Sequence, residues 1–351
     1  MNETASRRPL ARLCVCACAL LLTSLAGCAS SGASAPITPP GGSDVFSPYV
    51  DVTLISPFDL SGVAADAGAR SLTLAFVTAG TGACEPAWGA QTPIDAAAVM
   101  KPAARLRAAG VALRVSFGGA QGPDLARGCG SASSLEAAYA SVLDRYQAVA
   151  ADFDLEGIML TDHTAIVRLS RAVAELQAQT RRPLAVSLTL PASPKGLSSA
   201  ALEDVRSMLA AGVHLSAVNL LAMDYGPAIA RGRMGATAIA AVGAAHRQLS
   251  ALRGRISKWS ALGVTAMVGV NDVSGEIFTL ADARTLASFA AQRGLGLTSI
   301  WSLARDNPCA GSESGAVPTC SGVSEPPYAF SRVFGAHATT GLLPRRAVDG
   351  S

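Results

Sequence analysis

The chain has 351 residues, of which 15% are charged and 5% aromatic, and its formal net charge at neutral pH is +3. Arg7, Arg8, Arg12 and Glu3 together contribute +2 of that charge, so the rest of the chain is almost neutral. Proteins that bind nucleic acid or anionic membranes by charge carry a basic surface. The composition therefore argues against nucleic acid as a partner and against electrostatic attachment to a membrane.

The N-terminal segment, residues 1–27, has the pattern of an export signal. The basic stretch "MNETASRRPLAR" precedes the short apolar run "LCVCACALLLTSLA" and the residues "LAGC". Ala26 and Gly27 before Cys28 resemble the bacterial lipobox, which implies cleavage before Cys28 and lipidation of its thiol. A plain secretory signal cut elsewhere is the alternative. The pair Arg7-Arg8 raises the Tat route, but the motif is incomplete and the Sec route is favoured.

Residues 28–44 follow as a Ser/Gly/Pro-rich stretch, which predicts a flexible tether with nothing to pack. We therefore expect an exported protein, either anchored in the cell envelope by lipid alone or secreted. We also expect a monomer.

From Tyr49 onwards, strand-like segments alternate with helical segments. The expected strands are 49–56, 71–78, 111–119, 151–157, 183–190, 216–226, 263–270 and 297–303. The expected helices are 59–68, 94–109, 134–149, 164–179, 198–211, 235–259 and 279–293, with a final helical turn in 326–336. This alternation predicts right-handed βαβ units and a parallel sheet.

Eight βα units over about 290 residues have the size of one (β/α)₈ TIM barrel. We therefore expect a single α/β barrel domain over residues 45–340, followed by a tail at 341–351. A doubly wound sheet is the rival fold. It usually has a Gly-rich phosphate-binding turn after its first strand, and "LISPFDLSG" has none.

Four cysteines remain after the signal residues Cys14, Cys16 and Cys18 and the lipidation residue Cys28 are set aside. An even number in an exported chain predicts disulfides. Cys309 and Cys320 enclose a short loop, "AGSESGAVPT", and are expected to pair; Cys84 and Cys129 then pair by elimination. Metal ligation is a poor alternative because no pair has zinc-like spacing and the four histidines are scattered.

The segment "ADFDLEG" (151–157) places three carboxylates at alternate positions of the fourth expected strand. Asp152, Asp154 and Glu156 would share one strand face because alternate side chains point the same way. A solvated edge strand is one reading. In a barrel, however, the row would point inward and rise to the mouth, where Glu156, as the strand's last residue, would meet the other strand ends.

Other strand ends contribute further polar and aromatic side chains to that mouth. The third strand ends in "SFGG", the sixth in "MDYG", the seventh in "GVND" and the eighth in "IWSL". His163, just beyond the acidic strand, reads as a helix-start residue.

This combination resembles the family 18 glycoside hydrolases, the chitinase family, over nearly all of residues 45–335. The family pattern Asp-x-x-Asp-x-Asp-x-Glu matches at Asp152, Asp154 and Glu156, whereas its first position falls on Val149. "SFGG" resembles the family's third-strand signature and Tyr225 its sixth-strand tyrosine. The usual Asp after that tyrosine is Gly226 here.

The resemblance implies retaining, substrate-assisted cleavage of β-1,4-linked N-acetylglucosamine chains. It implies that Glu156 is the proton donor, that Asp154 supported by Asp152 orients the substrate acetamide, and that Tyr225 hydrogen-bonds it. Trp301 would form the floor under the sugar. The remaining expected substrate contacts are Asp224, Phe117, Asn271 and Trp88. For Trp88 a folded-over loop aromatic, and for Asn271 a turn former, are equal alternatives.

Chitin or N-acetylglucosamine-containing oligosaccharides are therefore the expected partners, and no cofactor or metal is expected. Two other functions stay open. One is an endo-β-N-acetylglucosaminidase acting on N-glycans or peptidoglycan, and the other is a non-catalytic chitin-binding barrel. The acidic motif alone does not separate them, because all three require the acetamide.

Overall fold

The computed structural model describes residues 45–54, 64–180, 182–226, 232–252, 255–311 and 315–340. The expected signal, Cys28, the tether and the tail at 341–351 lie outside the described residues. No helix within these ranges is both long enough and apolar enough to cross a bilayer.

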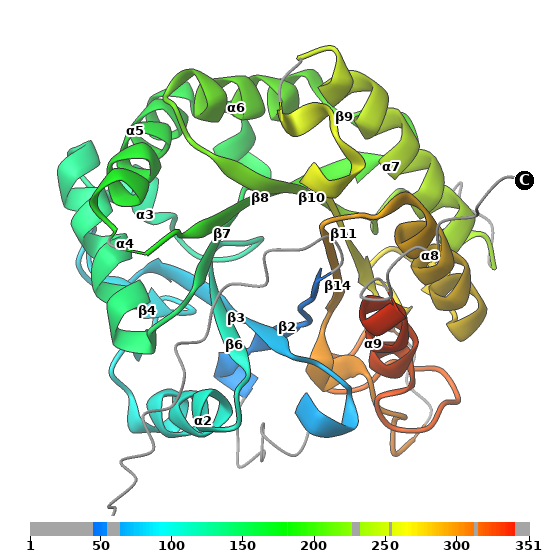
Figure 1. Cartoon of the computed structure of the whole chain (residues 1–351). Helices are drawn as coiled ribbons and strands as arrows, with labels where there is room; N and C mark the ends of the chain where they lie inside the picture. The colour runs from blue at the N-terminus through cyan, green and yellow to red at the C-terminus, as the bar shows by residue number, and fades with distance from the viewer. Residues whose placement is uncertain are drawn as a thin grey trace, which may run out of the picture. The chain divides into compact units, whose positions relative to one another are not determined.

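A closed ring of eight parallel strand positions forms the centre of the described part (Figure 1). The strands are β1 Val45–Phe46, β2 Tyr49–Asp51, β3 Ser71–Ala79, β6 Ala112–Gly118, β7 Ala150–Asp154, β8 Ala185–Ser193, β10 Leu215–Leu221, β11 Leu262–Met267 and β14 Leu297–Trp301. The first strand is split in two: β1 pairs with β14 and β2 pairs with β3, which closes the ring. The expected (β/α)₈ barrel is confirmed.

Helices surround the ring of strands (Figure 1). They are α2 Ala97–Ala108, α3 Leu125–Gly128, α4 Ala132–Tyr146, α5 His163–Gln179, α6 Ser199–Ala210, α7 Met234–Ser250, α8 Leu280–Arg293 and α9 Ala329–Thr340. The 3₁₀ turns are η1 Val52–Leu54, η2 Gly157–Thr161, η3 Arg255–Ser257, η4 Trp259–Ala261 and η5 Leu303–Arg305. Of the helix expected at 59–68, residues 59–63 lie outside the described residues, and 64–66 are helical.

Several element boundaries differ from the sequence-based expectation, among them the first strand, which ends at Asp51. The helix expected at 235–259 ends at Ser250, and two short 3₁₀ turns follow it. The fourth barrel strand ends at Asp154, two residues before Glu156, because Gly157 turns the chain at φ 53°. The sixth strand ends at Leu221, so "MDYG" lies in the loop that follows it.

Short antiparallel strands also extend the barrel rim, and the sequence pattern did not predict them. They are β4 Pro86–Trp88 and β5 Thr92–Pro93 beside β3, β9 Gly196–Leu197 beside β8, and the pair β12 Gly269–Val270 and β13 Ile277–Phe278.

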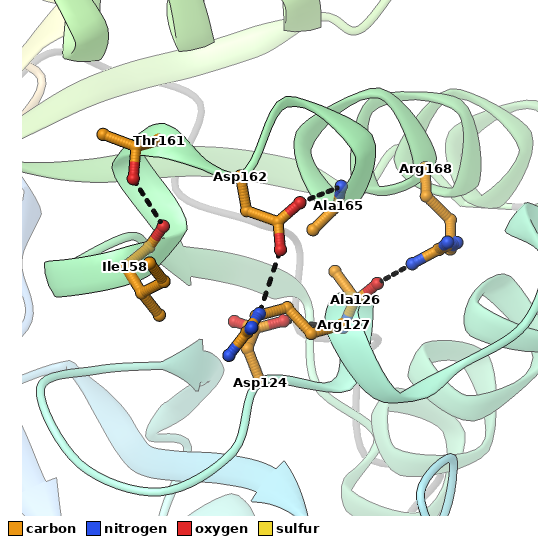
Figure 2. A network of polar contacts seen from close by, with 8 residues as sticks. All are labelled: Asp124, Ala126, Arg127, Ile158, Thr161, Asp162, Ala165 and Arg168. Atoms are coloured by element: carbon orange, nitrogen blue, oxygen red, sulfur yellow. Dashed lines mark hydrogen bonds and ion pairs between the residues drawn. The ribbon is translucent and has the colours of Figure 1, made fainter.

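The chain behind the acidic strand is fixed by a polar network between α3 and α5 (Figure 2). Asp162 caps α5 by accepting a hydrogen bond from the Ala165 amide at 3.0 Å, and it pairs with the Arg127 Nε at 3.0 Å. Arg168 donates to the Ala126 carbonyl. His163 is therefore the first residue of α5, as expected from the sequence.

Both expected disulfides form. Cys84 joins Cys129, which links the loop after β3 to the residue that follows α3. Cys309 joins Cys320 and closes the loop that follows β14 and η5. Bridges of this kind typically contribute about 2–4 kcal/mol to the free energy of unfolding.

Gly118 lets the third strand pass close to the acidic fourth strand. It has φ +99°, and an added Cβ would lie 2.2 Å from the backbone carbonyl oxygen of Asp154. The neighbouring Gly119 amide donates a hydrogen bond of 2.9 Å to that same oxygen. The first glycine of "SFGG" is therefore needed to position Asp154.

We expect Gly118→Ala to destabilise the fold by more than the about 1–3 kcal/mol that a strained backbone conformation costs by itself. Gly212→Ala is the matched control, since Gly212 has φ +87° but open space where its Cβ would lie. Urea unfolding of both variants measures the difference. Equal losses of stability would contradict the proposed close contact with Asp154.

Candidate active site

The row of carboxylates on β7 points into the barrel, as the alternation predicts. Asp152 and Asp154 are 0% and 1% exposed, and Glu156 is partly exposed at the mouth. Phe153 lies on the opposite face, stacked on Phe117 with ring centres 5.5 Å apart. The reading as a solvated edge strand is therefore wrong.

Asp152 is the acceptor at the centre of a hydroxyl network inside the barrel. Tyr49 and Ser116 donate to its Oδ2 at 2.8 and 2.7 Å, whereas Thr189 donates to Oδ1 at 2.7 Å. Ser187 also donates to Oδ1 and itself accepts from the buried Arg114 guanidinium at 3.0 Å. These bonds compensate a buried carboxylate for the water it has lost.

Asp154 lies between this network and the mouth and has a different environment. Its Oδ1 is buried, lines the cleft described below and has no hydrogen-bond partner among the described residues. Burial raises the pKa of Asp154 well above its usual range, and the neighbouring Glu156 and Asp152 carboxylates raise it further. The Asp154 carboxyl is therefore available to form a hydrogen bond with a ligand in the cleft.

Glu156 is the outermost member of the row. Burial raises the pKa of Glu156 to about 7, with a further contribution from the charge of Asp224. A carboxyl group with this pKa is substantially protonated near neutral pH and can deliver a proton to a substrate.

Asp224 faces Glu156 from the loop after β10. Its backbone has a positive φ of 53°, its side chain is exposed at the cleft, and burial followed by the charge of Asp272 raises its pKa. The structure thus fixes the direction of Asp224, which the sequence left open.

We expect Asp224→Asn to move the alkaline limb of the activity profile to lower pH. Removing the negative charge lowers the pKa of Glu156, so the proton donor is lost earlier as pH rises. The measurement is kcat/KM against pH, with the exposed Asp144→Asn on α4 as control. An unchanged alkaline limb would show that Asp224 does not act on the proton donor.

A cleft of about 830 Å³ opens at the carboxyl ends of the strands and includes Asp154 and Glu156 in its wall. Trp301 forms an aromatic floor with Phe76, the ring centres lying 5.3 Å apart in a stacked arrangement. Tyr49 meets the Trp301 ring edge-on at 6.0 Å. The proton donor and an apolar platform therefore share one cleft of a size that holds several sugar units.

Tyr225 lies beside this cleft but is not among the described residues that line it. Its hydroxyl is buried without a hydrogen-bond partner in the described part of the chain, and burial, then Glu276 and Asp224, raise its pKa. The adjacent Gly226 amide donates to Glu276 at 2.7 Å. A contact between Tyr225 and substrate stays a prediction.

Two expected substrate contacts, Phe117 and Asn271, are wrong, and the structure leaves that of Trp88 open. Phe117 is 2% exposed and packs on the outer face of β6, against Tyr139 with ring centres 4.6 Å apart. Trp88 has no exposed surface and donates from Nε1 to the Tyr146 hydroxyl at 2.9 Å, but the residue is among those that line the cleft, so its contact with substrate stays a prediction. Asn271 is buried, and its amide donates to two carbonyls of its own loop.

The sequence analysis missed the hydroxyl network around Asp152. Its members Tyr49, Ser116, Ser187 and Thr189 come from three strands, β2, β6 and β8. The signal was present: Ser and Thr at alternate positions of apolar strands, as in "VSLTL". Within the described ranges, no group of His, Cys, Asp or Glu has an arrangement that would hold a metal ion.

A closed barrel with an acidic row rising to an aromatic-floored cleft is the architecture of a barrel glycosidase. No protein-family model matches the chain. Two curated proteins are 35% identical to it: a probable bifunctional chitinase/lysozyme of Escherichia coli K12, over 83% of this chain, and endochitinase 11 of Metarhizium anisopliae, over 76%. The chain spans about a third of the first protein's length (34%) and about half of the second's (53%).

Among solved structures, active domain 2 of a thermostable chitinase from Pyrococcus furiosus is similar in sequence and in fold. The two are 30% identical with a TM-score of 0.77, and the alignment covers 88% of this chain and 99% of that domain. That domain was solved as catalytic-site mutants in complex with chito-oligosaccharides. The chain belongs to the chitinase family of glycoside hydrolases.

Proposed function

We propose that this protein is an endo-acting chitinase that cleaves β-1,4-linked N-acetylglucosamine chains with retention of configuration. The observation that carries the proposal is the row of Asp152, Asp154 and Glu156 beneath one cleft, with Trp301 as its floor. The chitinase names of the relatives and the chito-oligosaccharide complexes of the Pyrococcus furiosus domain support the substrate class.

In the proposed mechanism Glu156 donates its proton to the glycosidic oxygen, so the bond from that oxygen to the anomeric carbon breaks. The acetamide carbonyl oxygen of the same sugar attacks the anomeric carbon and forms a cyclic oxazolinium ion. Asp154 accepts a hydrogen bond from the acetamide nitrogen as positive charge develops on it. Glu156 then removes a proton from the water that opens the ring.

Asp152 supports Asp154 in the proposed reaction, and the hydroxyl groups around Asp152 hold it in place for that role. Asp154 must give up a proton, or share one with Asp152, when the oxazolinium forms. Asp152 is held in place beneath Asp154 by four hydroxyl donors, which fixes its position relative to Asp154. We assign Asp152 a supporting role.

The experiment that tests the function is incubation with chito-oligosaccharides and, separately, with a high-mannose glycopeptide, with products identified by mass. A chitinase releases short oligosaccharides from the first substrate alone. Cleavage only within the glycan core of the second would instead identify an endo-β-N-acetylglucosaminidase. Binding without cleavage of either would identify a non-catalytic barrel.

We further propose that the protein is exported and anchored by lipid on Cys28, on the basis of "LAGC" after a basic and then apolar segment. Cys28→Ser should move the protein from the membrane to the soluble fraction and remove the lipid from its mass. The check is cell fractionation with mass spectrometry of the intact protein. Unchanged membrane association would contradict the anchor.

A further inference from the structure

The cleft wall carries acidic groups in addition to the proposed proton donor and its neighbour in the row. Of the described residues that line it, Asp51, Asp224 and Asp272 are acidic in addition to Asp154 and Glu156, and none is Lys, Arg or His. Asp272 and Asp224 are exposed, and Asp51 is partly exposed. The cleft wall therefore has acidic side chains that no basic side chain of the described lining balances, and a concave wall concentrates the field of such groups.

These carboxylates lie around the sugar platform and not only at the scissile bond. Asp51 ends β2, in the first strand position of the barrel, and Asp272 follows β11. Those positions are the two neighbours of β14, which carries Trp301 at its end. Both carboxylate residues therefore line the same cleft as Trp301.

The buried cation Arg305 does not form an ion pair with the described acidic residues of the cleft wall. The Arg305 guanidinium is 2% exposed and donates to the carbonyls of Val268, at 3.0 Å, and Val317. The Arg305 guanidinium interacts electrostatically with Asp272 and Asp224, so it offsets part of the negative charge of these two carboxylates. It presents no donor to a ligand in the cleft.

The unpartnered Asp154 Oδ1 in the same cleft marks where a substrate amide belongs. The sugar at that point must keep its acetamide, whereas sugars on either side face the other carboxylates. We propose that the cleft selects its glycan by charge: it favours N-acetylglucosamine chains interrupted by cationic glucosamine units and rejects chains that carry anionic lactyl groups, as peptidoglycan does. This inference rests on the proposed function and names its substrate class.

The size of the effect follows from the exposure of the carboxylates. An exposed ion pair changes an affinity by a modest amount, so each carboxylate should contribute about two- to fivefold. Salt should weaken the preference, because exposed charges are screened over about 10 Å at 0.1 M ionic strength.

The test compares three glycans at a mildly acidic pH at which glucosamine is protonated: a fully acetylated chitin hexamer, partially deacetylated chitosan oligomers, and peptide-free peptidoglycan strands. kcat/KM is measured at about 0.02 and about 0.5 M NaCl, a range over which screening changes strongly. The variants are Asp51→Asn and Asp272→Asn, with Asp144→Asn on the outer helix α4 as control. The Glu156→Gln variant provides dissociation constants for the same glycans.

We expect the chitosan-to-chitin ratio of kcat/KM to fall in high salt and in both cleft variants, while the control keeps it. Peptidoglycan strands should be cleaved poorly at low salt. A ratio that neither salt nor the variants change, or peptidoglycan cleaved as well as chitin, would overturn the inference. If the hexamer is not cleaved at all, the proposed function fails, and the Glu156→Gln dissociation constants still decide whether binding follows charge.

Discussion

Glu156→Gln should reduce the rate of chito-oligosaccharide hydrolysis by about 10²–10⁴-fold, the usual cost of losing general acid–base assistance. Glutamine has almost the same size and keeps a hydrogen-bonding oxygen, but it has no proton to deliver to the glycosidic oxygen. The loss should therefore fall on kcat, with binding of oligosaccharide retained. Steady-state kinetics and calorimetric titration measure the two separately.

The matched control is Glu175→Gln, because Glu175 is exposed on the outer helix α5. It should leave kcat and stability as they are. A Glu156→Gln enzyme whose rate stays within a factor of two of wild type, in a protein shown to be active, would mean that another group donates the proton. It would also contradict the hypothesis that Asp152, Asp154 and Glu156 form a catalytic row.

The acidic row could be predicted because a strand has a period of two residues, and the pattern alone places Asp152, Asp154 and Glu156 on one face. The same rule should have excluded Phe117. Ser116 and Gly118 face the barrel interior and the acidic strand, so the residue between them points outward to the helices.

The rim was harder to predict, because a position after a strand does not fix the direction of a side chain. Trp88 lies in β4, whose pairing with β3 turns the indole onto Tyr146. The Asn271 side-chain amide donates hydrogen bonds to two backbone carbonyls of its own loop. Asp224 lies within electrostatic range of Glu156 and has a backbone with positive φ, which the letters "MDYG" do not specify.

The hydroxyl network depended on the register between strands. Ser187 faces Asp152 because these two residues are direct partners in the ladder between β7 and β8, and Ser116 is the partner from β6 on the other side. Register is known only once the barrel is closed. The missing first acid of the family motif, at Val149, has no bearing on this network, because all four hydrogen bonds to Asp152 come from other strands.

Asp154→Asn should also reduce hydrolysis strongly, by about 10²-fold or more, as expected when one group that stabilises developing charge is removed. Asparagine fits the same buried space beneath Glu156. It cannot take the negative charge that balances the oxazolinium nitrogen, and its amide hydrogens oppose the acetamide N–H.

The readouts that separate this role from a structural one are the pH profile and inhibitor binding. Because burial and the charges of Glu156 and Asp152 raise the pKa of Asp154, removing this titrating carboxyl should move the acidic limb of the profile in Asp154→Asn. A cyclic analogue of the oxazolinium ion should bind the variant less tightly than wild type, while a plain oligosaccharide binds equally well.

Asp152→Asn provides the comparison. It places an amide donor among hydroxyls that donate to Asp152, which should cost about 1–3 kcal/mol of stability. Its rate loss should nevertheless be smaller than that of Asp154→Asn, because Asp152 lies deeper and does not reach the acetamide. The contradicting outcome is an Asp154→Asn variant that loses stability yet keeps the acidic limb of its pH profile and its affinity for the cyclic analogue. In that case Asp154 would be a packing residue and would not stabilise the acetamide nitrogen of the substrate.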